Sequence, residues 1–153
     1  MFAKYETLLD GLSIGPTWLK NESIAKIVCE VFHYRDQNEY DLCAYCVMPN
    51  HVHLVFKLQE ENKSDDKNDF PVTKMLQELK RYTAVESNRI LKIKGQFWQH
   101  ESYDRVICNG QEHENTIRYV INNPVKAGLT DHWENWSHSY CKPEYIDTFR
   151  ENM

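Results

Sequence analysis

The chain has 153 residues, the length of one ordinary domain, and its 41% apolar content is enough to build a hydrophobic core. Its formal net charge of −5 argues against a general nucleic-acid binder, because such proteins are usually basic. The sequence shows no transmembrane run, no signal peptide and no disulfide framework among its five cysteines, so we expect one cytoplasmic domain over residues 1–153.

Helical periodicity identifies the first predicted element, NESIAKIVCEVFHY, which starts at residue 21. Its apolar residues recur three and four positions apart, which is typical of an amphipathic helix. They are Ile24, Ile27, Val28, Val31 and Phe32. Asn21 or Ser23 can cap the start of this helix.

Two strands, residues 40–48 and 51–58, follow as a hairpin around the turn Pro49-Asn50. Alternation in the second strand places Val52, Leu54, Phe56 and Leu58 on one face and His51, His53, Val55 and Lys57 on the other. In the first strand, Cys43 and Cys46 are three residues apart, a spacing that puts the thiols on opposite faces. We therefore favour buried free thiols over half of a zinc site.

The second half of the chain begins with an acidic loop, residues 59–70. A helix follows, with an apolar stripe formed by Val72, Met75, Leu76, Leu79 and Tyr82. We then expect a strand over 97–107, a helix over 112–122 that Pro124 limits, and an irregular tail over 130–153. This order predicts an α+β fold, a ferredoxin-like antiparallel sheet with helices on its faces.

Two imidazoles two residues apart on a strand point the same way, so His51 and His53 can bind one divalent ion. The alternative is a pair of solvent-facing or hydrogen-bonded histidines. Tyr119 and Asn123, four residues apart, share one face of the last predicted helix and could be presented to the same point. Alternatively, Tyr119 is a core residue and Asn123 caps the turn that follows.

Three motifs, MPNHVHLV, FWQHESYDR and RYVINNPVKAGL, resemble in their order and separation those of the bacterial REP-associated tyrosine transposases, members of the HUH endonuclease superfamily. The resemblance implies that His51, His53 and Asn123 bind Mg²⁺ or Mn²⁺ and that Tyr119 is the nucleophile. It further implies nicking and strand transfer on single-stranded or hairpin DNA through a covalent 5′-phosphotyrosine.

The distribution of charge permits a local DNA-binding surface, although ordinary solvated helix faces would explain it equally well. Residues 71–126 contain nine basic side chains against six acidic ones, and the rest of the chain contains nine against seventeen. The candidate DNA-binding cations are Lys74, Lys80, Arg81, Arg89, Lys92, Lys94, Arg105, Arg118 and Lys126. Trp98 and Tyr103 are either aromatic side chains on which DNA bases stack or aromatic residues of the core.

Members of this family normally begin with a further, central strand, and the start MFAKYETLLDGL reads as too short to supply it. We therefore expect that strand to be missing, which would leave the histidine strand with an exposed edge, suited to pairing with a second subunit in a homodimer. Two other functions stay open. One is a catalytically inactive nucleic-acid-binding relic or repressor, and the other is a small metallohydrolase in which Tyr119 only packs.

Overall fold

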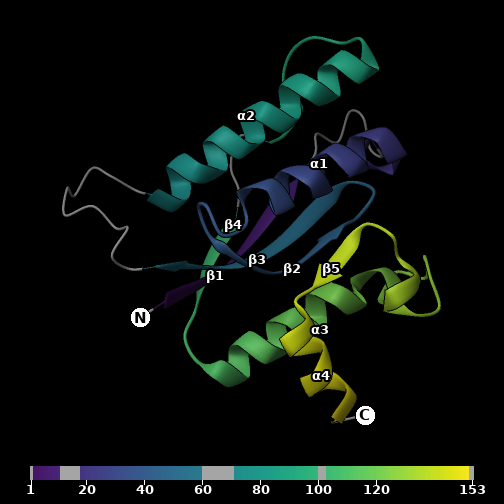
Figure 1. Ribbon diagram of the computed structural model, residues 1–153. Coiled ribbons are helices and arrows are strands. Elements are labelled where there is room, and N and C mark those ends of the chain that lie inside the picture. The colour runs from purple at the N-terminus through teal and green to yellow at the C-terminus, as the bar shows by residue number, and fades with distance from the viewer. Residues whose placement is uncertain (1, 11–17, 60–70, 100–102, 152–153) are drawn as a thin grey trace.

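The computed structural model describes residues 2–10, 18–59, 71–99 and 103–151 (Figure 1). Within these ranges the chain forms one five-stranded antiparallel sheet in the order β4-β1-β3-β2-β5. The strands are β1 (Phe2–Asp10), β2 (Asp41–Val47), β3 (His51–Gln59), β4 (Tyr103–Ile107) and β5 (Ser139–Cys141). The helices are α1 (Glu22–Arg35), α2 (Pro71–Leu91), α3 (Gly110–Lys126) and α4 (Pro143–Glu151), with short 3₁₀ turns at Trp18–Lys20 and Trp133–Asn135. The predicted α+β class is confirmed. The acidic loop falls largely on residues 60–70, outside the described ranges.

The prediction of a missing first strand is wrong. Residues 2–10 form β1, which pairs with β3 along its full length and with β4 on its other side. Alternation explains why this short segment suffices: Leu9 is buried and Tyr5 stacks on Phe56 on one face, while Glu6 faces the other. Because β3 lies between β1 and β2, the histidine strand has no exposed edge. The edge strands are β4 and β5.

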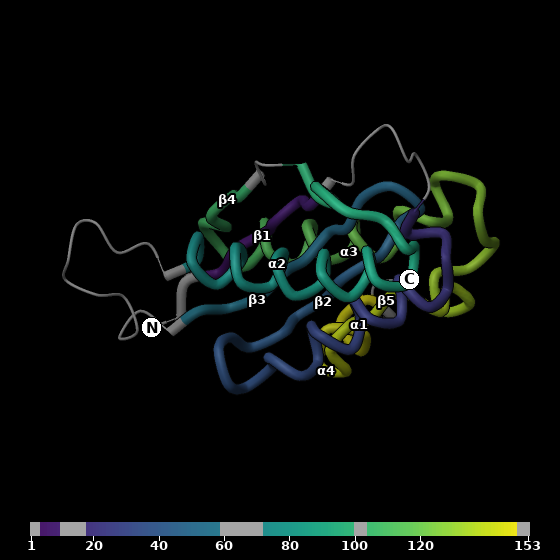
Figure 2. The backbone as a smooth tube through the Cα atoms, turned by 90° about the horizontal axis from the view of Figure 1, so that it is seen from above, coloured from purple at the N-terminus to yellow at the C-terminus, as the bar shows by residue number. Residues whose placement is uncertain are grey.

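Helices cover both faces of the sheet: α1 and α2 lie on one face, and α3 and α4 on the other (Figure 1). Seen from above in Figure 2, α2 runs along the sheet over β1 and β3. Asn21 caps α1 by accepting hydrogen bonds from the amides of Ser23 and Ile24. Tyr82 of α2 does not join the predicted stripe. It is half exposed, and Thr83 is buried in its place.

The predicted strand over 97–107 is shorter than expected, because β4 begins only at Tyr103. Phe97 and Trp98, which precede β4, belong to no strand and pack into the core that α1 and α2 cover. The indole Nε1 of Trp98 donates a hydrogen bond of 2.8 Å to Thr83 Oγ1, and Phe97 stacks on Trp18. The aromatic run therefore fills the core where a strand was expected.

Helix α3 passes through Pro124 and ends at Lys126, four residues beyond the predicted end. Gly128, with a φ of 76°, then turns the chain, and Leu129 N–H bonds to the carbonyl oxygen of Pro124. Proline lacks the N–H that would bond to the preceding turn, so Pro124 costs α3 one backbone hydrogen bond, and the helix continues for only two residues beyond it. Asn123 is consequently a helical residue rather than a residue at the boundary.

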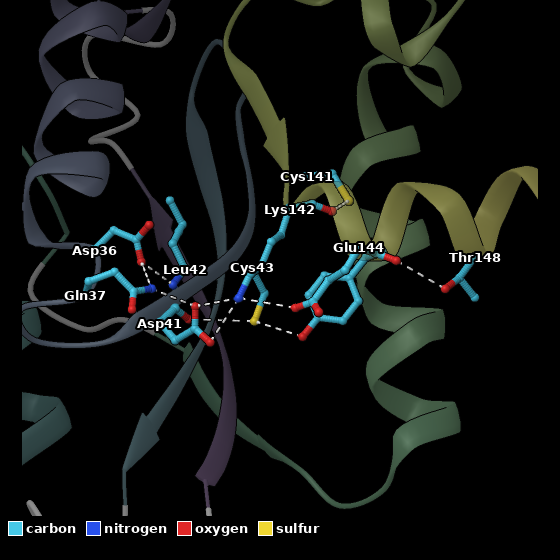
Figure 3. Close-up of polar contacts among 10 residues, drawn as sticks. Asp36, Gln37, Asp41, Leu42, Cys43, Cys141, Lys142, Glu144 and Thr148 are labelled. Atoms are coloured by element: carbon cyan, nitrogen blue, oxygen red, sulfur yellow. Dashed lines mark hydrogen bonds and ion pairs between the residues drawn. The ribbon is translucent and has the colours of Figure 1, made fainter.

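Between residues 130 and 151 the tail forms regular elements, where an irregular tail was predicted. Strand β5 extends the sheet beyond β2, and α4 returns across α3. Figure 3 shows how this end is held: Lys142 Nζ contacts Asp41 Oδ1 at 3.0 Å and Glu144 Oε1 at 3.2 Å. Trp136 Nε1 also donates to the carbonyl oxygen of Val47, so side-chain contacts reinforce the pairing of β5 with β2.

A register shift in β2 corrects the prediction for the CxxC pair. The pairing with β3 slips between Leu42 and Ala44, so Cys43 is an extra residue in the strand. As a result Cys43 and Cys46 both lie in the α3-side core, not on opposite faces. Both are buried free thiols, as predicted. Burial raises the pKa of Cys43 to about 11 and that of Cys46 to about 12.

None of the helices in the described part of the chain is long and apolar enough to cross a membrane.

Candidate active site

Strand β3 presents both histidines toward α3. Val52 and Leu54, on the opposite face of the strand, are fully buried and fix its orientation. The centroids of the two imidazole rings lie 5.0 Å apart, and the ring planes are nearly perpendicular. His51 Nδ1 is 2.8 Å from Asn50 Oδ1, and His53, which is 7% exposed, has its Nδ1 3.8 Å from Glu6 Oε1. The predicted pairing of the two histidines on one face is therefore observed.

Helix α3 brings Tyr119 to this pair. Ile117, Val120 and Ile121 are buried against the sheet and leave Tyr119 at the rim of that contact, 53% exposed. Its ring meets the His53 ring edge-on, with the centroids 5.8 Å apart. Asn123, partly buried, lies one turn later on the same helix face. Tyr119 is thus neither a core residue nor remote from the histidines.

The structure adds Glu6, which sequence reasoning missed because β1 was not predicted. Glu6 of β1 stands opposite Arg105 of β4, and its Oε2 accepts from Arg105 Nη2 at 2.8 Å and from Nε at 3.1 Å. The hydrogen bond with Glu6 raises the pKa of Arg105 above its usual value. The sequence pattern that could have predicted β1 is its alternation of side chains, which puts the polar residues Lys4 and Glu6 on one face.

Arg105 continues this contact to α3. Its guanidinium pairs with Glu112 and donates to Thr116 Oγ1 at 2.9 Å. A polar pocket of about 550 Å³ opens beside these residues and reaches Tyr119. It is lined by Glu6, Arg105, Asn109, Gln111, Glu112, Asn115, Thr116 and Tyr119.

Most of the predicted DNA-binding cations lie elsewhere. Lys74, Lys80, Arg81 and Arg89 belong to α2, and Lys92 and Lys94 follow it, so all six lie on the opposite face of the sheet from Tyr119. Lys80 Nζ donates to the carbonyl oxygen of Gln99 at 2.6 Å. The structure therefore does not bring the basic helix to the histidine-tyrosine site.

The remaining candidates lie on the side of α3. Lys126 Nζ is 5.9 Å from the centre of the Tyr119 ring. Arg118 packs over Phe149 of α4 and pairs with Glu114. Trp98 is 3% exposed, so it is a core aromatic residue, and its assignment as a residue that stacks with DNA bases is wrong. The side chain of Tyr103 lies outside the described residues.

The donor atoms at the site fit a divalent cation. An amide oxygen only accepts, so the contact with Asn50 Oδ1 favours the tautomer of His51 with its proton on Nδ1 and its lone pair on Nε2, the nitrogen that would bind a metal. Histidine ligands ordinarily present their other ring nitrogen to an oxygen in this way. Among the described residues no three His, Cys, Asp or Glu side chains come together as a metal site. Asn123, on the same face of α3 as Tyr119, offers an amide oxygen, a ligand type that suits a hard divalent cation.

Comparison with known proteins gives this arrangement its family. A family model described as "Transposase IS200 like" matches residues 17–123, a range that holds both histidines, Tyr119 and Asn123. The chain belongs to the IS200-like transposase family.

Individual relatives of the IS200-like chain agree with this assignment. A Haemophilus influenzae (strain ATCC 51907 / DSM 11121 / KW20 / Rd) protein named "Putative REP-associated tyrosine transposase" is 25% identical over 122 residues, which is 76% of this chain and 64% of that protein. The chain thus spans a little under two thirds of this relative.

Two solved structures share the fold of this IS200-like protein. One, "Structure of the REP associates tyrosine transposase bound to a REP hairpin", superposes with a TM-score of 0.64 at 17% identity and covers 97% of this chain and 81% of its own. The other, a transposase structure from Deinococcus radiodurans R1, has a TM-score of 0.54 at 16% identity and covers 80% and 91%.

Proposed function

We propose that this IS200-like transposase nicks and rejoins single-stranded DNA, with hairpin DNA as its substrate class, through a covalent bond to Tyr119. The observation that carries the proposal is the contact between the half-exposed Tyr119 ring and His53. This position leaves the Tyr119 side chain open to a polymeric substrate, as a nucleophile that attacks DNA must be. The relative solved with a REP hairpin supports hairpin DNA as the substrate class.

The proposed step balances as an in-line displacement at phosphorus. Tyr119 Oη forms the new P–O bond, the bond from phosphorus to the 3′ oxygen breaks, and the phenol loses its proton while the leaving 3′ oxygen gains one. The products are a 5′-phosphotyrosine and a free 3′-OH. Since the ester energy is retained, the reverse displacement joins a second 3′-OH without ATP.

His51, His53 and Asn123 would hold the divalent cation, Mg²⁺ or Mn²⁺. All three ligands are neutral, so the ion would keep its full charge for stabilising the phosphate oxygens in the transition state. Lys126, beside the Tyr119 ring, is the nearest candidate for holding the DNA backbone there. Arg118 is less suited because its guanidinium already packs on Phe149.

The presence of β1 removes the structural reason for expecting an inactive relic, because the sheet that carries the histidines is complete on both sides of β3. The opposite-face cations of α2 would then serve a second stretch of DNA or only the solubility of the helix.

The test is a denaturing gel of the purified protein incubated with a labelled hairpin bearing single-stranded flanks, with Mn²⁺ or with EDTA. We expect a protein-DNA adduct that requires Mn²⁺ and is lost in Tyr119→Phe, while Tyr82→Phe, also half exposed, keeps it. DNA cleavage that survives Tyr119→Phe would favour the metallohydrolase. Binding that is indifferent to EDTA, with no adduct, would favour the inactive binder.

A further inference from the structure

A carboxylate stands between the histidine strand and the neighbouring edge strand. Glu6 directs one oxygen, Oε1, toward His53 Nδ1 at 3.8 Å and the other, Oε2, toward the Arg105 fork at 2.8 and 3.1 Å. The Glu6 side chain is 16% exposed. A partly buried carboxylate shared between an arginine and a histidine ring has a fixed position, because the two-pronged arginine contact leaves it little freedom.

We propose that Glu6 and Arg105 form a positioning pair that orients His53 for the metal and ties the histidine strand to the helix of Tyr119. The inference rests on the proposed function, because it concerns the metal site of that reaction. A carboxylate only accepts, so Glu6 selects the tautomer of His53 with the proton on Nδ1 and the lone pair on Nε2, the tautomer that can ligate a metal through Nε2. The 3.8 Å between Glu6 Oε1 and His53 Nδ1 is longer than a hydrogen bond. We expect metal binding to shorten it, because hydrogen bonds in active sites often tighten when the ligand binds.

The second half of the pair's role is structural alignment. Arg105 contacts Glu112 and Thr116 in the first turns of α3, and Thr116 lies three residues before Tyr119. Glu112 is itself fixed, since its Oε2 accepts from the amide of Cys108 and its own amide bonds to Asn109 Oδ1. The contacts therefore run from β3 through β1 and β4 into α3. This assigns Arg105 a positioning role in place of the DNA contact predicted from sequence.

Glu6→Gln tests the pair with an almost unchanged shape. Arg105 offers only donors, so the new amide must turn its oxygen toward Arg105 and its NH₂ toward His53. His53 Nδ1 then has to accept, which moves the ring proton to Nε2 and removes the ligating lone pair. Glu86→Gln is the matched control, because it makes the same change at a carboxylate that pairs with an arginine, Arg89 of α2, on the opposite face of the sheet from His53.

Two readouts on the metal-free protein decide the matter. Calorimetric titration with Mn²⁺ should show an affinity about 10- to 100-fold weaker in Glu6→Gln, and an affinity like that of the wild type in Glu86→Gln. Long-range ¹H–¹⁵N spectra of the histidine rings should show His53 protonated on Nδ1 in the wild type and on Nε2 in Glu6→Gln. A His53 tautomer that does not change, or an unchanged Mn²⁺ affinity, would overturn the role of Glu6.

If Glu6→Gln does not fold, Arg105→Gln replaces it. That variant frees the Glu6 carboxylate but leaves it beside His53, so we expect weaker Mn²⁺ binding with the Nδ1–H tautomer retained, and unchanged binding would overturn the pair. Failure of the proposed function gives different results. If the wild-type protein binds no Mn²⁺, the metal site itself is refuted. If it binds Mn²⁺ normally but forms no adduct, only the role of Tyr119 as nucleophile is refuted, and the role of the positioning pair is not.

Discussion

His113 should make the protein markedly less stable in mild acid. It is 4% exposed on α3, its ring packs edge-on against Tyr145, and neither ring nitrogen has a hydrogen-bond partner in the described part of the chain. Burial, together with the positive charges of Lys4 and Lys57, lowers the pKa of His113 from 6.5 to about 4, while the charge of Glu144 opposes this shift. Charging this ring in the folded protein is therefore unfavourable.

The sign and size of the effect follow from linkage. Between pH 6.5 and pH 4 the unfolded chain binds a proton at this histidine that the folded protein does not, so the free energy of unfolding falls as the pH is lowered through that window. A difference of that size corresponds to about 3 kcal/mol in full, of which about 2 kcal/mol is lost between pH 7 and pH 5. For a domain with a stability of about 5–15 kcal/mol, that loss is large.

Urea unfolding at pH 7 and pH 5, followed by tryptophan fluorescence, measures this loss. His113→Phe keeps an aromatic ring against Tyr145 and cannot titrate, so its stability should fall by about 2 kcal/mol less than that of the wild type over the same interval. His132→Gln, at an exposed position, is the control and should follow the wild type. Equal losses in wild type and His113→Phe would refute the reasoning.

Three further predictions concern the site, the core and the thiols. Asn123→Ala should weaken Mn²⁺ binding, measured by calorimetry, by at least tenfold. Its midpoint of thermal unfolding should stay within a few degrees of that of the wild type, because Asn123 is only partly buried. An unchanged Mn²⁺ affinity would show that Asn123 is not a metal ligand. Trp98→Phe should lower the free energy of unfolding by about 1–3 kcal/mol in urea titrations, because it deletes the hydrogen bond to Thr83 and part of a buried ring, and a neutral effect would contradict the core assignment. Under native conditions iodoacetamide should label exposed Cys108 first by peptide mass spectrometry, since burial raises the pKa of Cys141 to about 12; early labelling of Cys141 would argue against this packing.

Patterns that depend on nearby residues were predictable from the sequence. The stripe of α1, the hairpin and the alternation that puts His51 and His53 on one face are all confirmed. Each is fixed by a local period of 3.6 or 2 residues and by an adjacent turn. The joining of Tyr119 to His53 was expected only from the family resemblance, because no local rule relates residues 66 positions apart.

Errors arose where tertiary contacts override a local signal. The strand β1 mixes polar and apolar residues and gains its stability from two partner strands that lie 50 and 100 residues away. An extra residue in β2 places Cys43 on the face opposite to the one predicted from simple alternation. Such a bulge cannot be predicted from the local composition. The aromatic run at 97–98 resembled a strand but fills the core. Glu6 was missed for the same reason as β1.

The central claim is that Tyr119 becomes covalently joined to DNA, and peptide mapping of the trapped adduct tests it most directly. After incubation with hairpin DNA and Mn²⁺, nuclease trimming and proteolysis, mass spectrometry should find a 5′-nucleotide phosphate on the peptide that contains Tyr119. A mapped phosphotyrosine at Tyr82, Tyr140 or another tyrosine, or cleaved DNA with no modified peptide, would contradict the account.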